Sequence, residues 1–327
     1  MEEWVGERWH RFIWRAADAS FPRAAVPLQE VQRPVQMLFR AGGGDPLVRV
    51  VPATAQKVGG ARGWLQKLAG QGERAALSTL DEQTLALPPT IAVFDDRSRT
   101  LAGRFWPGAL TMVLPLQKTA RIAPAVTAGL DTIALRCPAH PVMRAVLQAC
   151  GVPLAAPSAN ASGGVSPTQA AHVAASLGDA AGLVLDGGAC AAGIESTIVA
   201  LRDTGWQVLR PGPVTTEQLA EVLGTALAVA ASERIEAPGQ LASHYSPGKP
   251  VRLDAAVPAA DEFLIGFGAV AGSVNLSPSG DLIEAAALLY ECLHAAAASQ
   301  HPRIAVAPIP AEGIGAAIND RLKRAAA

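Results

Sequence analysis

The chain has 327 residues, of which half are hydrophobic and 17% are charged, and its formal net charge is −1. This length favours two domains, and the near-neutral balance argues against a protein that wraps duplex nucleic acid or lies on an anionic membrane. The four cysteines and six histidines lack metal-ligand spacing, so neither a zinc site nor a disulfide framework is predicted. With an acidic start, no signal-peptide core and no apolar run of about 18 residues, we expect a soluble, cytoplasmic protein with no membrane contact.

Regular elements are predicted from about residue 91 onward. Residues 1–90 show little periodicity, and only a helix near 62–78 is suggested there. The next segment predicts a helix that ends at Pro107-Gly108 and then buried strands around a second helix. The predicted helices span 95–106 and 141–151, and the predicted strands span 109–116, 131–138 and 152–157.

The stretch "LAAPSANASGGVSPT" (154–168) is rich in hydroxyls and glycines. Ser166 and Gln169 have capping-box spacing with Pro167 at the first helical position, which predicts a helix over 168–178. Backbone N–H groups at a helix start, together with the side chains of Ser158, Asn160 and Ser166, would suit an anion. A plain surface turn before a capped helix explains the same residues, so both interpretations stay open at this point.

The rest of the chain alternates strands and helices. A second capping box, Thr215 to Gln218, predicts a helix over 216–224 with Gly224 as its stop, and a linker follows over 225–249. The alternation after residue 250 predicts a small α/β domain with a largely parallel sheet, in which the helix over 281–299 packs its stripe of Leu, Ala and Tyr290 side chains into the core. The further predicted strands are 182–188, 196–201, 206–210, 251–254, 262–268, 273–276 and 303–310, and the last predicted helix is 313–326.

Polar side chains stand at the ends of three predicted strands. Arg136 ends an apolar strand, where it is either an edge residue with its charge in water or a clamp for a carboxylate or phosphate. Thr132 lies four residues earlier on the same face. Glu195 and Ser196 precede another strand, and Arg210 ends a third. Ligands of open α/β sheets bind at such strand ends.

Seven motifs, in this order, resemble the long-form threonylcarbamoyl-AMP synthases: "RFWPGALTMVLP", "TIALRCPAHP", "APSANASGGVSPT", "LDGG", "ESTIV", "LRPGP" and "PGQLASHYSP". The resemblance covers about residues 91–327 and implies an α/β fold. It implies a YrdC-like domain with a twisted, open mixed sheet over 91–224, a linker or lid over 225–249, and a Rossmann-like domain over 250–327. The implied nucleotidyltransferase reaction joins L-threonine, bicarbonate or CO2, and ATP, with Mg2+, into threonylcarbamoyl-AMP and pyrophosphate. Partner proteins would transfer the threonylcarbamoyl group to tRNA, and a direct tRNA contact is possible within this scheme.

The resemblance also implies binding residues, although it singles out no catalytic residue and no metal ligand. Arg136 would clamp the threonine carboxylate, with Ala156 and Ser196 lining the threonine pocket. The implied ATP contacts are Thr132, Ser158, Asn160, Ser166, Arg210, His244 and Tyr245, the last two in a segment that folds over the site.

Residues 1–90 lack three motifs of that family: P-T-E-T-x-Y-G-L, K-x-R and N-P-L-x-x-H. Divergence, a truncated pseudo-enzyme and a change of reading frame upstream of about residue 90 all explain the loss. The abrupt return of pattern favours the third explanation. A second function therefore stays open, that of a catalytically impaired remnant that binds nucleotide or RNA.

Overall fold

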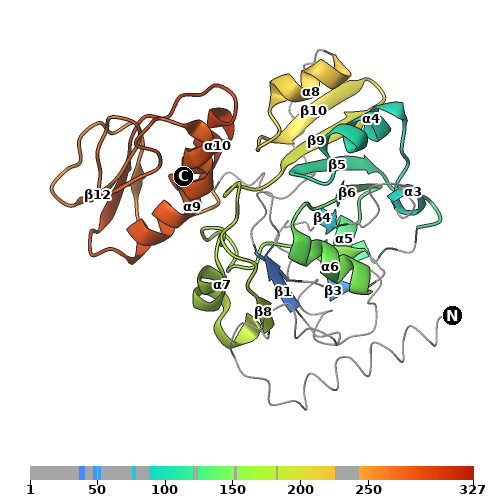
Figure 1. The fold of residues 1–327 in the computed structure, drawn as a ribbon, viewed down its shortest axis with the longest axis horizontal. Coiled ribbons are helices and arrows are strands. Elements are labelled where there is room, and N and C mark those ends of the chain that lie inside the picture. The colour runs from blue at the N-terminus through green and yellow to red at the C-terminus, as the bar shows by residue number, and fades with distance from the viewer. Residues whose placement is uncertain are drawn as a thin grey trace.

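The computed structural model describes residues 37–40, 47–49, 51–52, 76–78, 88–120, 122, 124–150, 153–181, 183–224 and 243–327. Three sheets with their helices form two bodies (Figure 1). The larger body holds a seven-stranded mixed sheet, and the smaller one, drawn in orange and red, holds a four-stranded sheet. The α/β fold class predicted for both parts is confirmed.

The seven-stranded sheet has the order β10-β9-β5-β6-β4-β7-β3. Neighbouring strands run parallel in β9–β5 and β6–β4 and antiparallel in the other pairs, so the sheet is mixed. Its strands are β3 (Val51–Pro52), β4 (Ala76–Ser78), β5 (Leu110–Pro115), β6 (Thr132–Arg136), β7 (Leu154–Ala156), β9 (Thr197–Arg202) and β10 (Gly205–Arg210). A smaller sheet joins β2 (Leu47–Arg49), β1 (Met37–Arg40) and β8 (Leu183–Leu185).

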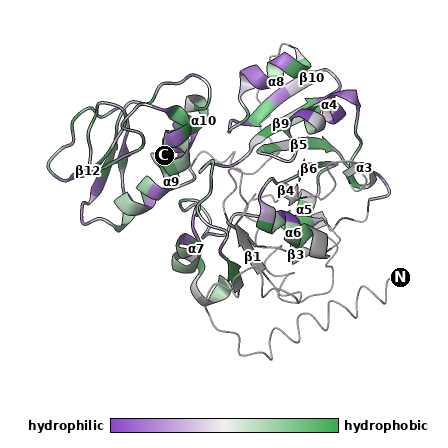
Figure 2. Cartoon of the chain, in the orientation of Figure 1, coloured by the Kyte–Doolittle hydropathy of each residue, from purple (hydrophilic) through white to green (hydrophobic). Residues whose placement is uncertain are grey.

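The helices of this larger body cover an apolar sheet. They are α3 (Pro88–Ile91), α4 (Asp96–Phe105), α5 (Pro124–Thr127), α6 (Pro141–Cys150), α7 (Ala170–Leu177), the 3-10 helix η2 (Gly178–Ala181) and α8 (Thr216–Leu223). Five of the six residues of β5 are buried, which is the continuous pattern of a strand with both faces covered. Figure 2 shows β5 in hydrophobic colours. The core joins Leu101 of α4, Met112 of β5, Leu135 of β6 and Leu219 of α8.

Two helix starts test the predicted capping boxes. At α8 the Thr215 hydroxyl accepts from the Gln218 amide and the Gln218 side chain accepts from the Thr215 amide, so that capping box is confirmed. The box predicted at Ser166 is wrong, because α7 begins at Ala170 and its N-cap, Gln169, makes no side-chain cap bond. The Ser166 hydroxyl donates instead to the buried carboxylate of Glu195.

The weakly patterned N-terminal part contributes strands to both sheets of the larger body. β4 lies between β6 and β7, where Leu77 pairs with Leu135 on one side and Ala155 on the other. The helix predicted near 62–78 is therefore wrong over its last three residues, because pairing with two neighbours decides their conformation. Its other residues lie outside the described part of the chain.

The smaller body is the C-terminal α/β unit. Its sheet has the order β11-β14-β12-β13 with every pair parallel, which confirms the predicted parallel sheet. The elements are β11 (Val251–Arg252), β12 (Glu262–Gly266), β13 (Val274–Asn275), α9 (Leu282–Ala298), β14 (Arg303–Val306) and α10 (Gly315–Ala325). Both helices lie on the side that faces the larger body (Figure 1). No helix in the described part of the chain is long and apolar enough to cross a bilayer.

Candidate active site

Arg136 lies at the end of β6 and is 1% exposed, so it is no surface edge residue. Its Nε donates to the carbonyl oxygen of Gly108 at 2.9 Å, and the Gly108 amide donates to the carbonyl oxygen of Cys137 at 2.8 Å. A Cβ on Gly108 would lie 2.2 Å from the carbonyl oxygen of Phe105, so the turn requires glycine. The Trp-Pro-Gly stretch thus presents the carbonyl that orients the guanidinium of Arg136.

Arg210 ends β10 and is 7% exposed. Its Nε and Nη2 donate to the carbonyl oxygen of Ser196 at 3.1 and 2.9 Å, and its Nη2 also lies 3.2 Å from Ser196 Oγ. The Ser196 hydroxyl in turn lies 2.8 Å from the hydroxyl of Thr111 on β5. The structure therefore brings together Ser196 and Arg210, which the sequence placed at two separate strand ends.

The electrostatics of this sheet edge favour an anion. Burial, and to a smaller extent the positive charge of Arg210, lower the pKa of Arg136 to about 9. A negative group beside the two guanidinium groups would counter both effects. Arginine also matches carboxylate and phosphate in a two-point geometry. The site can therefore hold a carboxylate or a phosphate.

The loop between β7 and α7 closes on itself beside this edge. The Asn160 amide donates to the carbonyl oxygens of Ala161 (2.9 Å) and Gly164 (3.1 Å), which holds the glycine turn. The Oδ1 atom of Asn160 is buried and makes no hydrogen bond within the described part of the chain. Ser158 at the start of the loop is exposed. The carbonyl oxygen of Gly163 accepts from the Ser246 amide at 2.8 Å, so the last part of the predicted linker lies on this loop.

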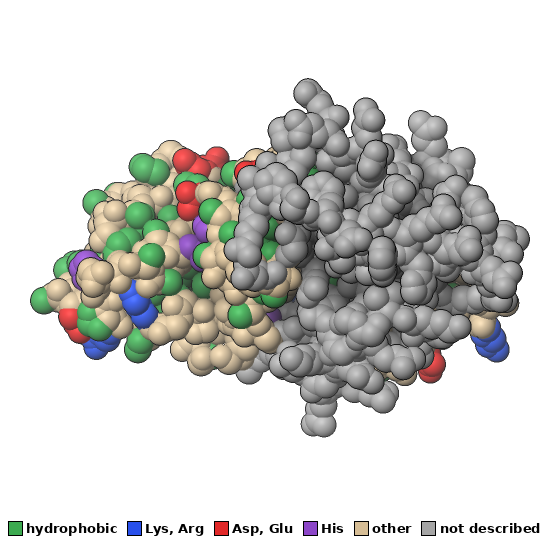
Figure 3. Space-filling model, turned by 90° about the horizontal axis from the view of Figure 1, so that it is seen from below, with side chains coloured by type: hydrophobic (Ala, Val, Ile, Leu, Met, Phe, Trp, Pro, Cys, Tyr) green, Lys and Arg blue, Asp and Glu red, His purple; other side chains and the backbone are tan. Residues whose placement is uncertain are grey.

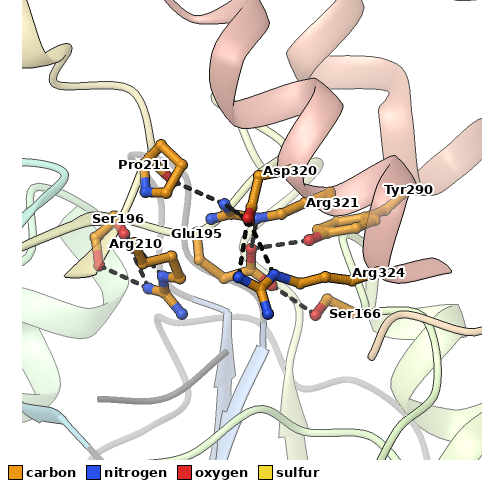
Figure 4. Close-up of polar contacts among 9 residues, drawn as sticks. All are labelled: Ser166, Glu195, Ser196, Arg210, Pro211, Tyr290, Asp320, Arg321 and Arg324. Carbon is orange, nitrogen blue, oxygen red and sulfur yellow. Dashed lines mark hydrogen bonds and ion pairs between the residues drawn. The ribbon is translucent and has the colours of Figure 1, made fainter. Parts of the chain in front are cut away.

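Glu195 is a buried carboxylate that connects the two bodies, as Figure 4 shows. Ser166 donates to its Oε1 at 2.7 Å, while Tyr290 of α9 and Arg321 of α10 donate to its Oε2 at 2.8 and 3.1 Å. Burial by itself raises the pKa of Glu195, but the charges of Arg321 and Arg210 and the two hydroxyl donors outweigh it, and the pKa is about 2. Glu195 is therefore ionised at neutral pH.

Sequence reasoning missed the C-terminal half of this network. It placed Tyr290 in the core, where the ring does lie, but did not anticipate the bond from its hydroxyl. Arg321 carried a readable signal, because it follows Ala317 and Ile318 by four and three residues on the buried face of α10. A charged residue within an apolar helix stripe requires a buried partner of opposite charge.

Comparison with known proteins identifies the family. Residues 79–212 match the family described as "Telomere recombination", and residues 214–327 match "Threonylcarbamoyl-AMP synthase, C-terminal domain". A threonylcarbamoyl-AMP synthase of Bacillus subtilis is 34% identical over 275 residues, covering 77% of this chain and 77% of the relative. The chain belongs to the threonylcarbamoyl-AMP synthase family.

Other members of the threonylcarbamoyl-AMP synthase family agree with this result. A Pyrococcus abyssi synthase is 38% identical over 161 residues, which cover 48% of this chain and 47% of that protein. The crystal structure of P. abyssi Sua5 complexed with L-threonine superposes with a TM-score of 0.76 and 26% identity, and covers 89% of this chain and 90% of that chain. The predicted resemblance and the two-part α/β fold are confirmed.

Two residues predicted to bind the substrates, Thr132 and Ala156, lie away from Arg136 and Arg210. Thr132 is the first residue of β6, about 13 Å along the strand from Arg136 at ~3.3 Å per residue. Ala156 ends β7 and pairs with Ala76 of β4, the strand between β7 and β6. Thr132 and Ala156 are assigned to different substrates, Thr132 to ATP and Ala156 to threonine, and both assignments stay predictions.

The predicted lid residues, His244 and Tyr245, pack against the C-terminal body. The ring of Tyr245 is 1% exposed, stacks 5.4 Å from the ring of Tyr290 and has the Arg321 guanidinium 5.7 Å from its centre. The His244 amide donates to the carbonyl oxygen of Arg324 at 3.1 Å. In this conformation both side chains are buried, with His244 9% and Tyr245 1% exposed.

Proposed function

We propose that this chain makes threonylcarbamoyl-AMP and pyrophosphate from L-threonine, bicarbonate or CO2, and ATP. The amine of threonine forms a carbamate either with bicarbonate, releasing water, or with CO2, releasing a proton, and a carbamate oxygen then bonds to the α-phosphorus of ATP. The bond from that phosphorus to the β-phosphate oxygen breaks and pyrophosphate leaves. The family to which the chain belongs supports the reaction. The buried pair Arg136 and Arg210 is the observation that supports the location of the substrate site at the ends of β6 and β10.

We assign the threonine carboxylate to Arg136. The bond from its Nε to Gly108 holds the guanidinium plane at the end of β6. A carboxylate in that plane would receive two parallel N–H bonds, and its charge would offset that of Arg210. Ser196, held between Arg210 and Thr111, would line the same pocket, with Ala156 further along the sheet.

The triphosphate would lie between Arg210 and the loop after β7, with Ser158 as a further contact. The Asn160 amide already donates to two carbonyl oxygens, so Asn160 would contact ATP through Oδ1, as an acceptor for a hydroxyl or amino group of the nucleoside. This reaction requires positive charge and N–H donors where negative charge develops at the α-phosphate, and it requires the reactants to be held together. The described residues hold no group of three or more His, Cys, Asp or Glu that could bind a metal alone. Mg2+ would therefore be bound chiefly by phosphate oxygens and water, as this ion commonly is beside nucleotides.

Further parts of the proposal concern the surroundings of the enzyme. We propose that it works in the cytoplasm and passes its product to proteins that modify tRNA. On the face shown in Figure 3, Lys and Arg side chains of the described residues are few and scattered. A direct tRNA contact stays a prediction.

Pyrophosphate release by the purified full chain tests the function. We expect release only with ATP, threonine and bicarbonate together, and a rise in the KM for threonine of about tenfold or more in Arg136→Lys, because lysine cannot make the two-point bond. Arg104→Lys is the matched control, since that side chain is 56% exposed and forms an ion pair with the exposed Glu221 at 3.4 Å.

The same experiment separates the second function. A folded chain that binds ATP but releases no pyrophosphate would be a remnant that binds nucleotide without turnover. The relatives, which are named as synthases, do not favour that alternative.

A further inference from the structure

We propose that Glu195 is a positioning residue through which the C-terminal body holds the substrate-binding loops in place. The proposal rests on the function proposed above and deepens it. Glu195 touches no substrate in this scheme. It acts through Ser166, whose loop is assigned to ATP, and through its neighbour Ser196, which is assigned to threonine.

The contacts of Glu195 reach both loops from one point. Oε1 accepts from Ser166 in the loop after β7, and Oε2 accepts from Tyr290 and Arg321, which belong to α9 and α10. The next residue, Ser196, has its carbonyl oxygen bound by Arg210. A shift of the Glu195 backbone would therefore move Ser196, the residue directly before β9.

The protonation state of Glu195 excludes a role as general base. With its pKa at about 2 it is a weak base, and three donors already occupy its two oxygens. An ionised carboxylate only accepts hydrogen bonds, so the proton of the Ser166 hydroxyl must point at Glu195. Ser166 then offers ATP its hydroxyl lone pairs and its backbone N–H, which has no hydrogen-bond partner among the residues that the structure describes, and the N–H is the group that suits a phosphate oxygen.

The remaining contacts of the network join the bodies over a wider area. Arg321 also donates to the carbonyl oxygen of Pro211, directly after Arg210, at 2.7 Å. Val165 and Ile194, each one residue before a member of the network, are buried in the same cluster as the core of α9 and α10. Both loops thus enter the hydrophobic core of the C-terminal body directly beside Ser166 and Glu195.

The test compares two variants with a matched control in the full chain. Glu195→Gln removes the charge between the bodies, and Tyr290→Phe removes one hydroxyl but keeps the stacked ring. Glu262→Gln removes another buried carboxylate, whose 2.6 Å pair with Arg252 lies wholly within the C-terminal body. The measurements are kcat and KM for ATP and threonine, together with ATP affinity by calorimetry without turnover.

We expect Glu195→Gln and Tyr290→Phe to raise the KM for ATP about tenfold, as for the loss of a hydrogen bond to a charged group, with kcat changing less. Glu262→Gln should keep the KM of the wild type even if its unfolding temperature falls. Unchanged KM values in both test variants would overturn the proposal. If Glu195→Gln does not fold, Tyr290→Phe alone tests the proposal.

The same measurements distinguish a failure of the proposed synthase function from a failure of the Glu195 proposal. If the wild-type chain binds ATP without releasing pyrophosphate, the synthase proposal fails, and ATP affinity then decides the role of Glu195. Weaker binding in both variants would support positioning, and binding equal to wild type would overturn it. A wild-type chain that neither turns over nor binds ATP would overturn both proposals.

Discussion

The contact between Gly193 and α9 gives a sharp test of how the two bodies join. Gly193 has φ +68°, and a Cβ there would lie 2.2 Å from the carbonyl oxygen of Ala286 and 2.5 Å from Cα of Ala287. Since non-bonded atoms prefer about 3.5 Å or more, α9 would have to move by roughly 1 Å to admit one methyl group. We therefore expect Gly193→Ala to separate the helix from the loop that carries Glu195.

The expected loss in the free energy of unfolding of Gly193→Ala has two parts. The left-handed conformation costs alanine about 1–2 kcal/mol, and overpacking against backbone atoms adds about 1–3 kcal/mol. Gly129→Ala is the control for the first part, because Gly129 has φ +74° and no heavy atom within 4 Å of the added Cβ. The difference between the two variants isolates the contact between the bodies.

Scanning calorimetry of the full chain measures that difference. At about 2–4 °C per kcal/mol, the unfolding temperature of Gly193→Ala should lie roughly 2–12 °C below that of Gly129→Ala. We also expect its KM for ATP to rise, because the Glu195 network moves with the loop. Equal unfolding temperatures for the two variants would refute the packing of α9 against Gly193.

Three further predictions follow from individual contacts. Because the pKa of Glu195 falls from its ordinary 4.5 to about 2 on folding, the charge contributes about 3 kcal/mol above pH ~4.5, which is lost as the pH falls toward 2. Urea unfolding should thus show a difference in the free energy of unfolding between wild type and Glu195→Gln that shrinks by more than about 1 kcal/mol from pH 6 to pH 3. A difference that stays constant with pH would contradict the assigned pKa. Thr215→Ala removes the capping box of α8 and should lower the free energy of unfolding by about 1 kcal/mol with no change in KM, whereas an altered KM would show that α8 affects the site. Thr111→Val removes the hydroxyl beside Ser196 and should raise the KM for threonine about fivefold in initial-rate assays; a raised KM for ATP alone would place Ser196 in the wrong pocket.

Local patterns in the sequence predicted most elements from residue 91 onward. The strand that became β5 was recognisable as a continuous apolar run, and α8 by its capping box and Gly224, because these signals depend on residues within one turn or one strand. The alternation after residue 250 predicted the parallel sheet for the same reason. Arg136 and Arg210 were recognisable as candidates because charged residues at the ends of apolar strands are unusual.

The partners of those residues were decided only in the tertiary structure. The Ser166 pattern fits a capping box equally well, but the Ser166 hydroxyl donates its hydrogen bond to a buried carboxylate 29 positions away. Arg321 lies 126 positions from Glu195 and Tyr290 lies 95 positions from it, and no periodicity relates residues so far apart. Short-range backbone preferences are written along the chain, whereas the partner of a buried charge is set by which elements the hydrophobic core brings together.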